Sequence, residues 1–96
     1  MGASSHSKAD LCNQITKALR LGRVTEALGL YERLEQQKPD EPRWSHRKGD
    51  LLHRMGRDHA AAIAYQRAAN LYAAKGFEAR AAATSRLMQQ IKPCPA

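Results

Sequence analysis

Three arginines at helical spacing are the residues of this sequence best suited to chemistry. Arg43, Arg47 and Arg54 are separated by four and then seven residues, a spacing that aligns them along one side of a helix. A planar guanidinium group binds a carboxylate through two parallel hydrogen bonds. We therefore expect an acidic segment of a partner protein to bind along this side. The candidate partner-binding residues are Arg43, His46, Arg47, Asp50, His53 and Arg54.

The same pattern also fits an ordinary solvent-exposed helix face on which charged residues pair with one another. Asp50 lies three residues after Arg47 and four before Arg54, where ion pairs within a helix contribute about 0.3–0.5 kcal/mol each. Both interpretations place the arginines opposite the buried side of the helix. That buried side is expected to contain Trp44, Leu51, Leu52 and Met55.

Catalysis and metal binding find no candidate residues in the sequence. His46 and His53 are seven residues apart, about 10 Å along a helix, which is too far for both to bind one metal ion. Cys12 and Cys94 match no zinc-binding spacing and lie in no setting that would activate a thiol. Paired carboxylates, phosphate-binding glycine loops and nucleophile motifs are missing too. We expect a protein that is not an enzyme and that has no metal or cofactor.

Length, charge and composition limit what the chain can be. Its 96 residues suffice for one small domain, and its net charge of +7 favours acidic partners. Its two cysteines do not resemble a disulfide framework, so we expect a reducing, cytoplasmic location. The sequence has no run of 18 apolar residues and predicts no membrane-spanning segment. Residues 1–7 are small and polar, and we expect them to form a flexible leader.

Composition and an internal repeat together predict the fold class. The chain has 17 alanines but only four valines and isoleucines together, which favours helices over sheets. An offset of 34 residues superposes Gly22 on Gly56 and Tyr31 on Tyr65, and an offset of 20 superposes Gly56 on Gly76. We therefore expect an all-α domain built from repeated helical hairpins.

This spacing resembles the tetratricopeptide repeat (TPR), a helix-turn-helix unit of 34 residues. The second helix of a TPR unit carries an alanine followed four residues later by an aromatic residue. Ala27 with Tyr31 and Ala61 with Tyr65 match that element. The resemblance covers about residues 8–93, and it implies a peptide-binding groove lined by the first helix of each unit. By this resemblance, the six candidate residues named above would face the groove.

The predicted organisation is two TPR-like units followed by a closing helix. The units are expected at 8–41 and 42–75, the closing helix at 76–93 and a short tail at 94–96. Five antiparallel helices are predicted over residues 8–21, 24–38, 41–55, 59–74 and 77–92. Asp40 is expected to cap the third of these helices.

Small and aromatic residues are expected in the core. Ala61 and Ala81 are predicted to lie where helices approach one another closely. All five aromatic residues fall on predicted buried stripes, so none is expected to stack on nucleic-acid bases. The buried stripe of the last helix is expected to contain Phe77, Ala81, Thr84, Met88 and Ile91.

These features favour a non-enzymatic protein-protein interaction module, a scaffold or adaptor that binds an acidic partner segment. The first alternative is a basic helical domain that binds nucleic acid, because positive charge neutralises phosphates. The second is self-association, or assembly within a larger regulatory protein, because repeat arrays need about three units before neighbours cover one another. The segment from Tyr65 to Phe77 looks like helical repeats of bacterial regulatory and assembly proteins.

Overall fold

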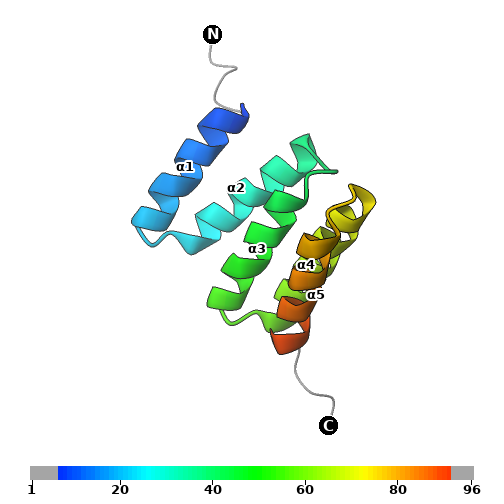
Figure 1. Ribbon diagram of the computed structural model, residues 1–96. Coiled ribbons are helices and arrows are strands. Elements are labelled where there is room, and N and C mark those ends of the chain that lie inside the picture. The colour runs from blue at the N-terminus through cyan, green and yellow to red at the C-terminus, as the bar shows by residue number, and fades with distance from the viewer. Residues whose placement is uncertain (1–6, 92–96) are drawn as a thin grey trace.

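Five α-helices joined by short turns make up residues 7–91, the part of the chain that this computed structural model describes (Figure 1). The helices are α1 (Lys8–Arg20), α2 (Val24–Gln37), α3 (Pro42–Arg54), α4 (Asp58–Ala74) and α5 (Glu78–Ile91). Successive helices run antiparallel, and residues 7–91 contain no strand. The all-α prediction is confirmed, and each helix boundary lies within one residue of its predicted position. The predicted tail at 94–96, with Cys94, lies outside the described residues.

Two helices are capped by residues other than those predicted. Ser7, which the sequence placed in the leader, caps α1, and its hydroxyl accepts a backbone N–H from the first turn at 3.2 Å. Glu41 rather than Asp40 caps α3, so the predicted Asp40 cap is wrong. The reason is Pro42, which occupies the first helical position and favours an extended conformation for the residue before it.

Three of the four turns between helices have the same construction around a glycine. Gly22, Gly56 and Gly76 have φ angles of 74°, 79° and 84°, a left-handed conformation that costs glycine little. The residue after each glycine donates its backbone N–H to the carbonyl oxygen five residues earlier, at 2.8 to 2.9 Å. This bond closes the last turn of a helix that ends in glycine. The glycines that superpose in the sequence therefore have equivalent backbone roles.

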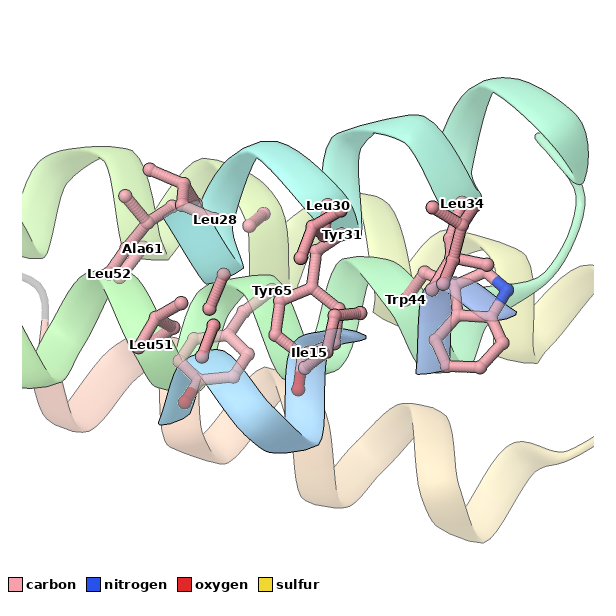
Figure 2. Close-up of a cluster of buried hydrophobic side chains, with 14 residues drawn as sticks. Ile15, Leu28, Leu30, Tyr31, Leu34, Trp44, Leu51, Leu52, Ala61 and Tyr65 are labelled. Carbon is pink, nitrogen blue, oxygen red and sulfur yellow. The ribbon is translucent and has the colours of Figure 1, made fainter. Parts of the chain in front are cut away.

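Each helix packs mainly on its neighbours in the chain, and the core lies between them. α2 contacts α1 and α3, whereas α4 contacts α3 and α5. The core cluster includes Leu11 of α1, Leu34 of α2, Trp44 of α3 and Tyr65 of α4, each at most 3% exposed. Figure 2 shows these side chains meeting between the helices. Contacts between sequence neighbours are typical of helical repeat arrays.

Small residues allow α3 and α4 to pack closely. Ala61 is completely buried, as predicted. A Cβ atom added at Gly49 would lie 2.8 Å from Cδ1 of Tyr65, so the tyrosine ring rests directly on the α3 backbone. Ala81 of α5 is only half-buried, and Thr84 is the one residue of α5 that is fully buried. α5 is thus covered less completely than the predicted stripe implied.

Four of the five aromatic residues are buried as predicted, and Phe77 is the exception. The buried rings are Tyr31, Trp44, Tyr65 and Tyr72. Phe77 is 49% exposed, so its predicted place in the core is wrong. It lies in the turn before α5, where its N–H bonds back to α4 and its ring lies 5.8 Å from the guanidinium carbon of Arg80. The turn, rather than the helical period, sets the direction of this side chain.

Candidate functional site

The candidate site is a cleft of about 190 Å³ between α1 and α3, two helices that run in the same direction (Figure 1). Tyr31 of α2 lies between them. The residues that line the cleft are Leu19, Tyr31, Arg47, Asp50, Leu51 and Arg54. The structure therefore brings together three of the six predicted binding residues, two of which are arginines.

The two arginines of the cleft have no carboxylate partner. Arg47 and Arg54 are exposed, and within residues 7–91 neither lies within 4 Å of a carboxylate oxygen. Other basic residues are paired: Lys48 Nζ lies 2.7 Å from Oε1 of Glu35, and Arg67 Nε lies 3.8 Å from Oε2 of the same residue. The cleft thus carries positive charge that the described part of the chain does not pair.

Tyr31 forms a buried wall of the cleft beside Arg47. Burial raises the pKa of the Tyr31 hydroxyl, and the guanidinium of Arg47 partly offsets this rise because it favours the phenolate. Tyr31 is 6% exposed, and Figure 2 shows its side chain pointing from α2 toward Ile15 of α1. Arg47 therefore stands at the junction of α1, α2 and α3.

Arg43 and Arg47 cover the ring of Trp44, which corrects the expectation that they lie opposite it. Their guanidinium carbons are 4.8 and 5.8 Å from the centroid of the Trp44 ring, a cation–π geometry. Residues one before and three after Trp44 lie 100° and 60° from it around a helix, adjacent rather than opposite. Arg43 also lies 3.4 Å from the Glu41 carboxylate, so its charge is partly balanced.

His46 faces α4 and α5 and contributes nothing to the cleft. Its ring packs edge-on against Tyr65 and Tyr72, with centroid distances of 5.6 and 6.1 Å. Its Nδ1 lies 3.4 Å from the hydroxyl of Thr84 on α5. Since Thr84 is buried and donates its own proton to a backbone carbonyl oxygen, these polar groups tie helices together.

Asp50 belongs both to the cleft and to this interhelical cluster. Its Oδ1 accepts a hydrogen bond from the Tyr65 hydroxyl, and its Oδ2 lies 3.8 Å from Nε2 of His46. Burial raises the pKa of Tyr65, and the hydrogen bond to Asp50 and its negative charge raise it further. The carboxylate of Asp50 is therefore held in position from the side away from α1.

His53 lies at the far end of α3 and interacts with the next helix. Its Nδ1 lies 2.8 Å from Oδ1 of Asp58, the first residue of α4. His53 is exposed and is not among the residues that line the cleft. The predicted set thus divides into a cleft group, Arg43 over Trp44, and two histidines directed elsewhere.

Sequence reasoning missed the contribution of α1 to the site. Leu19 forms the wall opposite α3, and Lys8 Nζ lies 5.9 Å from the centroid of the Trp44 ring. The signal available was the repeat itself, because equivalent first helices of two successive units lie side by side. Matching α1 to α3 along their lengths would have placed Lys8 near the start of α3 and Leu19 near its end.

A larger cleft of about 490 Å³ lies on the α2 and α4 side of the molecule. Its lining residues are Glu32, Glu35, Gln36, Pro39, Lys48 and Arg67. Glu35 accepts a hydrogen bond from the Ser45 hydroxyl at 2.6 Å and pairs with the two basic residues there. Its cations are thus already neutralised, which makes it a weaker anion site than the α1/α3 cleft.

Comparison with family models, with curated proteins and with solved structures finds no match. The resemblance to TPR units therefore stays a prediction from residue spacing. Among residues 7–91, no three His, Cys, Asp or Glu side chains are grouped to hold a metal ion, and no helix has the length and apolar character needed to cross a bilayer. Cys12 is a half-buried free thiol on α1. The α1/α3 cleft is the feature from which function is argued.

Proposed function

We propose that this chain is a non-enzymatic protein-binding module of the TPR type, and that an acidic segment of a partner binds between α1 and α3. The observation that carries this proposal is the pair Arg47 and Arg54, which face one cleft and have no carboxylate partner within the described residues. Guanidinium groups form strong, charge-assisted hydrogen bonds with carboxylates. A rigid helix fixes the positions from which both arginines reach, which lowers the entropic cost of binding.

The repeated geometry supports the TPR part of the proposal. Gly22 and Gly56 end α1 and α3 with the same hydrogen-bond pattern, and Ala27 and Ala61 are both completely buried in the following helices. In TPR proteins the first helix of each unit lines the peptide groove. α1 and α3 would occupy those places here. A role as a cytoplasmic scaffold or adaptor belongs to the same proposal.

Peptide binding to the purified chain tests the proposal. The probe is a fluorescent peptide rich in glutamate, compared with a peptide in which glutamine replaces each glutamate. We expect the glutamate peptide to bind at least tenfold more tightly. Replacing Arg47 or Arg54 by alanine should weaken its binding by about 1–3 kcal/mol, because each change removes hydrogen bonds to a charged group.

Arg33→Ala is the matched control, because Arg33 is an exposed arginine of α2 outside the cleft. It should leave the affinity for the glutamate peptide unchanged. Circular dichroism melts should show that all three variants remain folded, since solvent-exposed arginines contribute little to stability. If the glutamate peptide binds equally well to Arg47→Ala, Arg54→Ala and the parent chain, the proposed site is wrong.

Nucleic-acid binding is the alternative that the net charge of +7 favours. Four of the five aromatic rings are buried, so Phe77 alone among the described aromatic residues could stack on a base. Binding driven by counterion release alone is independent of sequence and vanishes as salt rises. Submicromolar binding of one defined sequence at physiological salt would favour this alternative over an acidic protein partner.

A further inference from the structure

We propose that the α1/α3 cleft selects acidic segments in which two carboxylates, about 10 Å apart, bracket a single aliphatic side chain. This inference rests on the proposed function and specifies the ligand of the same site. Three features of the cleft carry it: the spacing of its unpaired arginines, the carboxylate between them, and the apolar walls beside that carboxylate.

The spacing of the arginines sets the distance between the ligand's carboxylates. Arg47 and Arg54 are seven residues apart on α3, which corresponds to about 10.5 Å along the helix axis. Two carboxylates on one side of the ligand must be separated by a similar distance to reach both guanidinium groups. In a helical ligand, residues i and i+7 meet this requirement because they lie two turns apart on the same face.

Asp50 determines what the middle of the ligand can be. It lies between the two arginines, about one turn from each, and lines the same cleft. The Tyr65 hydroxyl and His46 hold its carboxylate from the opposite side. A ligand carboxylate placed at the centre of the cleft would meet this fixed negative charge and be repelled. The central side chain of the ligand must therefore be uncharged.

The walls beside Asp50 favour an aliphatic side chain at that central position. Leu19 of α1 is half-buried and Leu51 of α3 is buried, and both line the cleft. The cleft volume of about 190 Å³ lies below the range of about 300–1,000 Å³ that is typical of pockets for drug-sized ligands. A single leucine or isoleucine side chain inserted between the helices would bury these walls and leave the flanking carboxylates at the rim.

Four labelled helical peptides test this pattern by fluorescence anisotropy with the full chain. The first has Glu at positions i and i+7 and Leu at i+4. The second replaces that leucine by alanine, the third replaces it by glutamate, and the fourth moves the second glutamate to i+5. We expect the first peptide to bind about tenfold more tightly than each of the others, although the third carries more negative charge.

Two protein variants assign this selectivity to residues. Asp50→Asn keeps an oxygen that can accept the Tyr65 hydroxyl but removes the charge, so it should bind the peptide with the central glutamate at least threefold more tightly than the parent chain does. Leu19→Ala should reduce the preference for leucine over alanine at least threefold. Arg33→Ala should change neither ratio. Circular dichroism establishes that each variant is folded, and the peptide series on the parent chain needs no variant at all.

The outcomes separate this inference from the proposed function. If none of the four peptides binds, or if Arg47→Ala and Arg54→Ala bind all four as the parent does, the proposed function fails and this inference fails with it. If the peptides bind through the arginines but with equal affinities, the inference alone is overturned. Tight binding of the peptide with the central glutamate to the parent chain would also overturn it, because Asp50 would then exert no selection.

Discussion

At the scale of single residues, the contact between Gly49 and Tyr65 sets how closely α3 approaches α4. A Cβ atom at position 49 would lie 2.8 to 3.1 Å from three carbon atoms of the tyrosine ring. That ring is 3% exposed, and its hydroxyl donates to Asp50, so it has little freedom to move aside. Close packing of this kind makes even one added methyl group costly.

We therefore expect Gly49→Ala to lower the free energy of unfolding by about 1–3 kcal/mol through overpacking. Gly29→Ala is the control, because Gly29 is exposed within α2 and a Cβ there meets nothing within 4 Å. It should raise stability by about 0.5–1 kcal/mol, the gain expected for alanine over glycine inside a helix. Urea denaturation of both variants measures these changes. Equal effects would show that the tyrosine ring does not constrain position 49.

The arginines show how far single residues could be predicted. Their spacing correctly indicated that Arg47 and Arg54 share a side of α3, because this depends only on the helical period. Their position relative to Trp44 was predicted wrongly, since the long side chains of Arg43 and Arg47 lie over the indole ring. Lys8 reaches the same ring from another helix, and no pattern local to α3 could have indicated that contact.

At the scale of the elements, the glycine turns determine where three of the helices end. Gly56 has a φ of 79°, and the hydrogen bond from Arg57 N–H to the Leu52 carbonyl oxygen depends on that conformation. Non-glycine residues pay about 1–2 kcal/mol for left-handed backbone geometry, whereas asparagine adopts it more readily than alanine.

Gly56→Ala should therefore lower the unfolding free energy by about 1–2 kcal/mol, and Gly56→Asn should cost less than Gly56→Ala. No atom lies within 4 Å of a Cβ at this position, so the cost would come from the backbone and not from packing. Thermal or urea melts of the two variants provide the measurement. A larger loss for asparagine than for alanine would contradict the assigned role of this turn.

The helices themselves were the part of the fold best predicted from sequence. Their boundaries follow from glycine and proline positions and from amphipathic period, which are local signals. The cap of α3 was missed because two acidic residues precede Pro42 and the choice between Asp40 and Glu41 depends on the conformation that the proline imposes. Phe77 was misplaced because it lies in a turn, where the helical period no longer applies.

At the scale of the whole molecule, the helices form an array in which sequence neighbours supply most of the packing. In such arrays stability is approximately a sum of terms for each unit and each interface. α5 fully buries only Thr84, and its Leu87, Met88 and Ile91 are half-buried. Polar links from α3 therefore matter more at this end of the array, where fewer apolar side chains are covered.

The same comparison of scales explains what the sequence could show of the site. A positively charged side of α3 was predictable, but a cleft requires a second wall, and that wall comes from α1. The direction of His46 depends on the packing of Tyr65, Tyr72 and Thr84 around it, which involves α4 and α5. Such arrangements depend on contacts between distant segments, and the helical period carries no information about them.

The cluster of Tyr65, Asp50 and His46 makes the stability of the array depend on pH above about 10, the usual pKa of tyrosine. Burial, the hydrogen bond to Asp50 and the charge of Asp50 all raise the pKa of Tyr65. The folded chain thus retains the phenol proton at a pH where the unfolded chain releases it. Because the unfolded state then binds fewer protons, the free energy of unfolding falls as pH rises.

Tyr65→Phe isolates this effect, since phenylalanine keeps the ring and cannot ionise. Near pH 7 the variant should be less stable by about 1 kcal/mol, because it lacks the hydrogen bond to Asp50. Above pH 10 this difference should shrink, because only the parent chain is destabilised by tyrosine ionisation at position 65 in the unfolded state. Urea denaturation of both chains at pH 8, 10 and 11 measures the change; these pH values are set to about two units below and one above the usual tyrosine pKa. Tyr31, whose pKa is also raised by burial, is present in both chains and cancels in the comparison. A difference that stays constant throughout this range would show that Tyr65 ionises as readily in the folded chain as in the unfolded one, and that its link to Asp50 does not hold α4 against α3.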